Sequence, residues 1–356
     1  MTTRTRNAIA LGVAAAVLAA ALVLFARTKA GHARTAAIDL VPYDARVVVS
    51  MNLDAIRRSP FGKFLRGDGQ APAGVPRSAC DRDALDQASE LAVWLPGDTP
   101  DQFGIAAIGS FVRDELIGCS RTTIARRGGH PSVTTEGDYV VVGDDDLGTD
   151  AARIAARADG VLLLGRPSVR TRMAAVGAGW SPSAAVQGEH AKMRAALGPA
   201  DVVLTAIVDR SVRDAARRLV GEGESLFDGV NAIGVAADTS ATVRVHARVW
   251  CNDASACEAL KTGLEARRSA MASSIAMRAA GVAGLVEGAR IERQDATVDV
   301  KLEAPARQVV DLIDRVARWG EENPARPRAP PPSGSFVVPN EMLPSPGSIT
   351  APAGSR

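Results

Sequence analysis

The segment Ala45–Ser59, ARVVVSMNLDAIRRS, decides the fold because a similar segment, DVVLTAIVDRSVRDA, occupies residues 201–215. At an offset of 156 residues, Val47 corresponds to Val203. In each segment a run rich in β-branched residues, which favour strands, is followed by apolar residues at helical spacing. Each segment therefore predicts a strand that runs into a short helix, and their similarity predicts an internal repeat.

Other landmarks recur at a second common spacing. A hairpin-like segment with an Asp near its turn occurs twice, and each copy is followed by a helix that begins near a proline, Pro167 or Pro305. The 138 residues that separate these two prolines also separate Cys119 from Cys257. The agreement between independent landmarks supports the repeat.

The repeat leads to a prediction of the fold class. Strands are expected at 91–96 and 103–111, and residues 243–249 alternate between apolar and polar side chains as a half-buried antiparallel strand does. A long helical stretch is expected over 254–287. The sequence predicts an α+β fold with two duplicated units of antiparallel sheet, 38–196 and 197–320, each with helices packed on one face.

The N-terminal region predicts a membrane anchor. Residues 8–26 form a run of 19 residues without a charge, which matches the roughly 30 Å of a bilayer core at 1.5 Å per helical residue. Residues 1–37 are therefore expected to be a transmembrane anchor and its linker, with the membrane as partner. A cleaved signal peptide and a buried helix are the alternatives.

The C-terminal region has a different composition. Residues 321–356 contain nine prolines and almost no core-forming pattern, which predicts a disordered proline-rich tail that could reach a protein partner in the envelope. For the whole chain of 356 residues, the net charge of +2 gives no basic surface for nucleic acid, and a hydrophobic content of 46% is typical of a globular protein.

The four cysteines bear on the compartment. Cys251 and Cys257 are too widely spaced for a Cys-x-x-Cys zinc knuckle or redox motif, which leaves a disulfide or two inert thiols. The repeat favours one disulfide in each unit, Cys80–Cys119 and Cys251–Cys257. Such pairs suit an oxidising space such as the bacterial periplasm, whereas four free thiols would suit a cytosolic domain. We expect a single-pass inner-membrane protein with its bulk in the periplasm, or a soluble periplasmic protein if the N-terminal segment is cleaved.

A family resemblance covers about residues 38–319. The segment VPYDARVVVSMNLDAIRRSPFGKFL, residues 41–65, resembles the start of uncharacterised bacterial membrane-anchored envelope proteins with tandem α+β units. The strand FGIAAIGSF at 103–111 and the segment VWCNDASAC at 249–257 are also similar to that group. The resemblance implies a fold and a compartment, and it implies no activity and no catalytic residues.

Few residues suggest chemistry. The histidines have no metal-ligand spacing; they are His32, His130, His190 and His246. The segment 177–182, GAGWSP, has a proline where a dinucleotide-binding loop needs its third glycine. An acidic run could offer oxygen ligands to calcium, although a solvated loop explains it as well; its carboxylates are Asp144, Asp145, Asp146 and Asp150.

These observations define the expected function. We single out no catalytic, cofactor-binding or metal-binding residue, expect no cofactor, and lean towards a protein that is not an enzyme. The expected role is binding or structural work in the cell envelope. The alternatives are a periplasmic hydrolase whose site is assembled from distant residues, and a carrier of an apolar ligand between helices and sheet.

Overall fold

The structure is a computed structural model that describes residues 36–63, 84–96, 102–210, 212–213, 228–279 and 281–322. The predicted anchor at 8–26, Cys80, and residues 323–356 of the predicted tail lie outside these ranges, whereas residues 321–322, assigned to the disordered tail, are helical. By its contacts the chain divides into two compact units, Met1–Arg315 and Val316–Arg356, and the sheet described below belongs to the first. Among the described residues no helix is long and apolar enough to cross a membrane.

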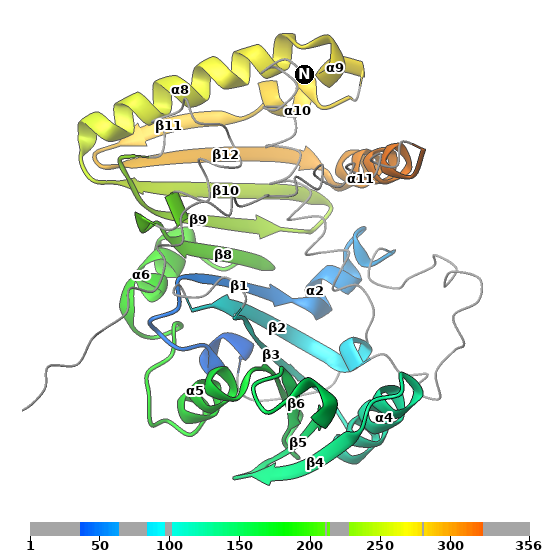
Figure 1. The fold of residues 1–356 in the computed structure, drawn as a ribbon. Coiled ribbons are helices and arrows are strands. Elements are labelled where there is room, and N and C mark those ends of the chain that lie inside the picture. The colour runs from blue at the N-terminus through cyan, green and yellow to red at the C-terminus, as the bar shows by residue number, and fades with distance from the viewer. Residues whose placement is uncertain are drawn as a thin grey trace, which may run out of the picture. The chain divides into compact units, whose positions relative to one another are not determined.

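The N-terminal half of the described chain contributes seven strands to the sheet (Figure 1). In chain order its elements are η1 (Ala37–Leu40), β1 (Val47–Asn52), α2 (Leu53–Arg58), η2 (Ala84–Gln87), β2 (Ala88–Leu95), β3 (Gly104–Gly109), α4 (Arg113–Arg126), β4 (Pro131–Glu136), β5 (Tyr139–Asp144), η3 (Asp145–Leu147), β6 (Arg153–Ala156), β7 (Val161–Gly165), α5 (Pro167–Gly177) and α6 (Gly188–Leu197).

The C-terminal half contributes five strands. Its elements are β8 (Val202–Ile207), β9 (Val230–Asp238), β10 (Thr242–Cys251), α8 (Ala254–Ser273), α9 (Ile275–Ala279), α10 (Ala283–Glu287), β11 (Arg290–Gln294), β12 (Thr297–Pro305) and α11 (Ala306–Glu322). Strands were expected at 91–96, 103–111 and 243–249, and β2, β3 and β10 confirm them.

All twelve described strands form one antiparallel sheet, which confirms the α+β class. Its order is β11-β12-β10-β9-β8-β1-β2-β3-β7-β6-β5-β4. From the central β8–β1 pair, the strands follow in the order β8-β9-β10-β12-β11 on one side and β1-β2-β3-β7-β6 on the other, so the first, second and third strands of each half are followed by its last two in reverse order. The strands β5 and β4 extend only the N-terminal half. Because β1 and β8 pair directly, the sheet is continuous across the predicted boundary at 196–197.

Helices cover both faces of the sheet, so the prediction of helices on one face is wrong. Val48 and Met51 are three residues apart on β1 and therefore point to opposite faces. On the side of Val48, a core cluster contains η1 and α5. On the side of Met51, another contains α2.

The strand registers extend these two faces along the sheet. Leu197 of α6 packs with Val203, on the same side as Val48. Helix α4 packs through Ile117 and α8 through Leu260 on the opposite side. Strands β1, β2, β3, β8 and β9 bury apolar residues on both of their faces, and a helix layer on one face would leave half of these residues exposed to water.

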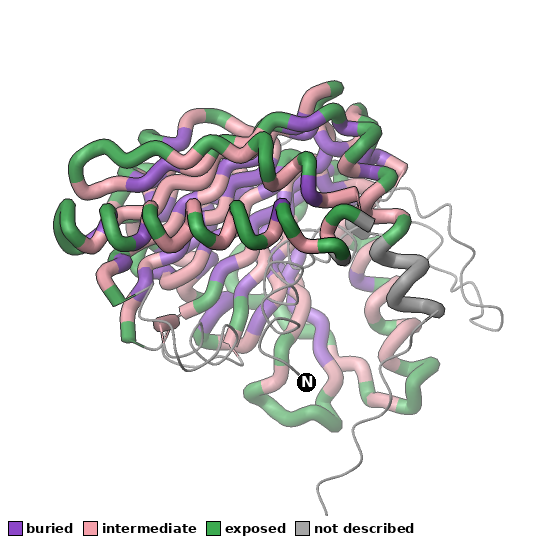
Figure 2. The backbone as a smooth tube through the Cα atoms, turned by 90° about the horizontal axis from the view of Figure 1, so that it is seen from above, coloured by how far each residue is buried: buried purple, intermediate pink, exposed green. Residues whose placement is uncertain are grey.

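The predicted helix over 254–287 is three helices. Helix α8 starts at the N-cap Asp253, whose carboxylate accepts a hydrogen bond from the Ala256 N–H. It ends at Ser274, and Gly281 separates α9 from α10 with φ of +74°, a conformation that glycine adopts without strain. Figure 2 shows exposed residues recurring along the outer side of α8, over strands whose residues are largely buried or intermediate.

Candidate functional site

The Cys251–Cys257 disulfide, predicted from the sequence, is present. It joins the last residue of β10 to the first turn of α8, with a Cα–Cα distance of 5.6 Å and six residues of separation. Both cysteines are buried in a cluster with Val230, Leu260 and Val298. The bond therefore fixes the corner at which the chain leaves the sheet and enters its longest described connecting helix.

Cys119 on α4 is also disulfide-bonded. Its predicted partner, Cys80, lies outside the described residues, so the Cys80–Cys119 pairing stays a prediction. Cys119 and Cys257 both lie in the helix that follows the third strand of their half, α4 after β3 and α8 after β10.

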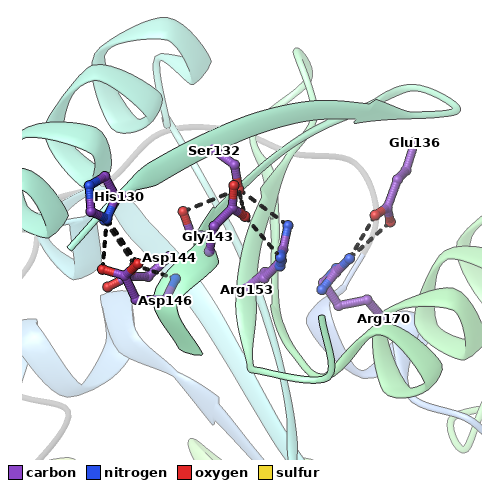
Figure 3. A network of polar contacts seen from close by, with 9 residues as sticks. His130, Ser132, Glu136, Gly143, Asp144, Asp146, Arg153 and Arg170 are labelled. Atoms are coloured by element: carbon purple, nitrogen blue, oxygen red, sulfur yellow. Dashed lines mark hydrogen bonds and ion pairs between the residues drawn. The ribbon is translucent and has the colours of Figure 1, made fainter. Parts of the chain in front are cut away.

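The acidic run forms part of a polar network at the base of the β4–β5 hairpin (Figure 3). The Asp146 carboxylate lies 2.8 and 2.9 Å from Nδ1 of His130. The Asp145 carboxylate accepts a hydrogen bond of 2.6 Å from the Ser132 hydroxyl and pairs with Arg153 at 3.3 Å. The network links β4, the η3 turn and β6 by charge and hydrogen bonds.

The remaining carboxylates of the run are also occupied. Asp144 accepts hydrogen bonds from the backbone N–H groups of His130 and Asp146, and Asp150 pairs with Arg166 at 2.9 Å. Among the described residues no group of three or more His, Cys, Asp or Glu side chains is arranged to hold a metal ion. The arrangement is therefore that of an ion-paired turn, and it gives the calcium alternative no support.

His130 is a base held by a carboxylate, without a nucleophile attached to it. The hydrogen bond that the His130 imidazole makes to the Asp146 carboxylate, and then the negative charge of Asp146, raise the pKa of this exposed imidazole above its usual range. Ser132 lies on the same strand but donates its hydrogen bond to Asp145. A catalytic triad needs a base that takes the proton of the nucleophile, so the hydrogen bonds of His130, Ser132 and their carboxylate partners do not form one.

His190 of α6 is fully buried beneath the sheet. Its Nδ1 lies 2.7 Å from the Thr205 hydroxyl and its Nε2 lies 2.7 Å from the Ala45 carbonyl oxygen. Because a carbonyl oxygen only accepts, Nε2 carries the proton and Nδ1 accepts from Thr205. Burial lowers the pKa of His190, so the ring is neutral and serves as a packed cross-link between α6, β8 and the start of β1.

A second polar cluster lies on the face of β10 and β12. The Asp299 carboxylate, 5% exposed, accepts hydrogen bonds from Arg248 at 2.7 and 2.9 Å and lies 2.6 Å from Nε2 of His246. Burial disfavours this carboxylate and is the largest single influence, but the hydrogen bonds and charges of Arg248 and His246 outweigh it and lower the pKa of Asp299. The sequence alternation predicts that His246 faces solvent beside arginines, whereas its side chain is only 24% exposed and is hydrogen-bonded to the buried Asp299.

A cleft lies where β1 begins and β8 ends. Its volume is about 370 Å³, and its lining residues come from far apart in the chain: Tyr43, Asp44, Arg46, Pro96, Arg172, Gly188, Glu189 and Ile207. Arg172 pairs with Asp44 and stacks over the Trp94 ring, 5.0 Å from its centroid. Arg46 lies 3.6 Å from Asp209.

The cleft is lined by both charged and apolar groups. Its lining carries two basic and two acidic side chains, so its charges balance. Four charged side chains around an open cleft differ from the closed apolar cavity that suits a carrier of an apolar ligand. Sequence reasoning missed the cleft because its residues share no local pattern. It also missed Asp299, although the lone acid between Val298 and Val300 faces a strand with two cationic positions.

The segment 177–182 ends a helix, in agreement with its exclusion as a dinucleotide loop. Gly179 has φ of +77°, and the N–H groups of Gly179 and Trp180 donate to the carbonyls of Val176 and Ala175. This pair of hydrogen bonds is the Schellman motif at the C-terminus of α5.

Comparison with known proteins adds no family. No protein-family model matches the chain, and no curated protein sequence matches it. Among solved structures the chain is similar to the one described as "Structure of crystal form I of TP0453", with a TM-score of 0.44 and 10% sequence identity over 80% of this chain and 98% of that chain. We draw no argument about function from a likeness of this size.

Proposed function

We propose that the chain is an exported envelope protein, tethered to the inner membrane by residues 8–26, whose α+β unit does binding or structural work and not catalysis. The observation that carries the proposal is the Cys251–Cys257 disulfide together with the bonded state of Cys119. Disulfides persist in oxidising compartments and are rare where glutathione and thioredoxin keep thiols reduced. Residues 8–26, an uncharged run of 19 residues ahead of the folded unit, supply a segment that can direct export and stay in the bilayer.

The polar clusters support a non-catalytic role. His130, His190 and His246 each use a ring nitrogen to bond a carboxylate or to cross-link the fold. Side chains committed in this way hold elements together. Binding is expected instead at the cleft where β1 begins and β8 ends, and there the side chains of Arg46 and Arg172 are each more than a third exposed.

The proposal predicts where the C-terminus lies. A fusion of alkaline phosphatase, which is active only in the periplasm, to the C-terminus of the full chain should be active. The same fusion lacking residues 8–26 should be inactive. A C-terminal fusion to a reporter that is active only in the cytoplasm should be inactive. If that reporter is active and the alkaline phosphatase fusion is inactive, the proposed periplasmic location is wrong.

Thiol labelling provides an independent test. In protein that is denatured in the presence of an alkylating reagent, Cys251 and Cys257 should be unlabelled unless a reductant is added first. Extraction of membranes with alkaline carbonate then separates a retained anchor, which stays with the lipid, from a cleaved signal peptide, which releases the protein. Quantitative labelling of both cysteines without reductant would contradict the proposal.

A further inference from the structure

We propose that the loop 178–187, between α5 and α6, docks on the surface of the bilayer that anchors the chain, with Trp180 and Val186 in the lipid interface. This inference rests on the proposed membrane tether and adds a second contact to it. The contact would fix which side of the folded unit faces the lipid.

The first observation is exposure. Trp180 is 85% exposed and Val186 is 74% exposed, and both lie in this one loop of ten residues. Single exposed apolar residues are ordinary on a protein surface, but an exposed indole is the side chain that best suits a lipid interface, where its ring meets acyl chains and its N–H stays hydrated.

The second observation is that the loop is held in place. The Schellman hydrogen bond from the Trp180 N–H to the Ala175 carbonyl, 2.9 Å, fixes the backbone of Trp180 to the end of α5. The Ala184 N–H donates to the Val41 carbonyl at 2.8 Å, and Pro42 and Ser183 form an isolated β-bridge. The backbone that carries the two exposed apolar side chains is therefore held by hydrogen bonds to α5 and to the segment before β1.

The third observation is where the chain enters the fold. The described residues begin at Ala36, and η1 follows at once and packs against α5. A Cβ built on Gly177, at the end of α5, would lie 2.9 Å from a methyl carbon of Leu40, so η1 and the start of the loop are in contact. Nine residues, 27–35, separate the apolar run from Ala36, and fully extended they span roughly 30 Å at most. The tether thus enters beside the loop and keeps it near the bilayer.

Charge and tethering decide the kind of contact. The cleft next to the loop carries Asp44 and Glu189 against Arg46 and Arg172, so the cleft itself adds no net positive charge. The tether carries the basic residues Arg27, Lys29 and Arg34, which can attract anionic headgroups. Insertion of Trp180 and Val186 is apolar and should persist in uncharged lipid and at high salt. Two apolar side chains would not hold a free protein at a membrane, but a short tether raises their effective concentration at the surface.

Tryptophan fluorescence of the full chain in lipid vesicles tests the inference. The emission of Trp180 is the difference between the native chain and Trp180→Phe, which leaves Trp94, Trp250 and Trp319 in place. In phosphatidylcholine vesicles the Trp180 emission should shift to shorter wavelength. It should be lost when the acyl chains are brominated, and high salt should abolish neither result.

The matched control moves the indole to another exposed apolar position. Ile275 is 84% exposed on α9, which packs against α8 and α10. In the Trp180→Phe, Ile275→Trp chain, bromination should leave the emission of the residue at 275 unchanged. Equal loss at both positions would mean nonspecific collapse on the lipid and would overturn the inference.

Flotation of the same vesicles separates the two proposals. If the chain does not float with the lipid, the tether is wrong and the docking falls with it. If it floats while Trp180 stays accessible to aqueous acrylamide and unaffected by bromine, the tether stands and the docking is overturned. If Trp180 is shielded from acrylamide without loss by bromine, a protein surface such as a second copy covers it, and the lipid contact is again overturned.

Discussion

Asp299 and its partners show how one strand position can be core in one half of the sheet and polar in the other. Strands β7 and β12 hold the same place in the sheet order, each beside the third strand of its half. On the face that carries η1, α5 and α6, β7 places Leu163 in the core, whereas β12 places Asp299 beside Arg248. A buried carboxylate is tolerated there because three hydrogen bonds satisfy it.

Replacement of Asp299 by Asn should lower the free energy of unfolding by about 2 kcal/mol at neutral pH. The substitution removes the carboxylate that pairs with Arg248 and His246, and these side chains, each 24% exposed, then lack their charged partner. The pKa of Asp299 is lowered in the fold, so its contribution is present above the unfolded value of about 3.9 and is lost as pH falls through the folded value. Urea unfolding at pH 7 and below pH 4 measures both effects.

Glu292→Gln is the control for this substitution. Glu292 pairs across the strands with Asp299, but its side chain is exposed and its ion pair with Lys301 is 3.2 Å long at the surface. Its loss should cost under about 1 kcal/mol. An Asp299→Asn chain as stable as the control would mean that the buried network contributes nothing.

His190 should make the protein sensitive to mild acid. Burial lowers its pKa, so the folded state stays neutral while the unfolded chain takes up a proton below about pH 6.5. Stability should therefore fall as pH drops from 6.5 towards the folded value, by up to about 1.4 kcal/mol per pH unit. His190→Gln should remove this slope in unfolding titrations between pH 5 and 7.

The raised pKa of His130 contributes in the opposite sense, since that group gains stability when protonated and loses it as pH rises through the folded value. His130→Gln should therefore steepen the acid loss, whereas His190→Gln should flatten it. If both variants keep the native slope, neither histidine sets the pH dependence.

At the scale of elements, the disulfide closes the β10–α8 corner. The Asp253 cap begins the helix two residues after Cys251, and the Cys251 N–H donates to the Ala296 carbonyl. The corner is thus fixed by a cap, a backbone hydrogen bond and a covalent bond within one short segment.

Removal of this bond should lower the free energy of unfolding by about 2 kcal/mol in the Cys251→Ala, Cys257→Ala chain, because a short closed loop restrains the unfolded state by roughly that amount. Guanidinium unfolding under oxidising conditions measures it. The bond of Cys119 is intact in the variant, so added reductant should still destabilise it further. Stability equal to that of the native chain would show that the loop constraint is offset by strain.

Element types were largely predictable from sequence, and their arrangement was not. Apolar alternation identified β2, β3 and β10, and prolines marked the starts of α5 and α11. The offset of 156, however, places Val48 on Leu204, and the register puts these residues on opposite faces: Leu204 pairs with Val49. A two-fold axis perpendicular to the sheet would relate residues of β1 to residues of β8 on the same face. In the observed register, residues of β1 and β8 that share a face differ in number by an odd value, so the offset of 156 does not relate equivalent positions.

The candidate sites were less predictable than the elements. Local sequence shows which residues are apolar or charged, but the cleft joins Asp44 to Pro96 through the β1–β2 pairing and to Ile207 through the β1–β8 pairing. Arg172 reaches the cleft from α5. The acidic run was visible, and its partners His130, Ser132 and Arg153 were not, because the β4–β5 hairpin brings them together. The Cys251–Cys257 disulfide could be predicted with its partner, because the matching positions of Cys119 and Cys257 favoured one disulfide in each half.

At the scale of the whole sheet, the two halves meet through backbone hydrogen bonds between β1 and β8. Five residues of β1, from Val47 to Met51, pair with β8, and Met51 and Val202 share one core cluster on the side of α2. Separation of the halves would expose the backbone hydrogen-bonding groups of β1 and β8, and their apolar side chains, to water. An exposed apolar edge strand is unfavourable.

The halves should therefore unfold as one cooperative unit. Native-state hydrogen exchange of backbone amides in β2 and β3 should report the same opening free energy as exchange in β9 and β10, because global unfolding is the event that exposes both.

Ser50→Pro provides the sharper test: Ser50 pairs with Val203 at the centre of β1, and proline cannot donate a hydrogen bond to the neighbouring strand. Protection should fall in both halves together, in β9 and β10 as much as in β2 and β3, while Thr134→Pro on the edge strand β4 should leave β9 and β10 protected. Loss of protection confined to β2 and β3 in the Ser50→Pro chain would mean that the halves fold independently and that the β1–β8 seam merely joins two separate domains.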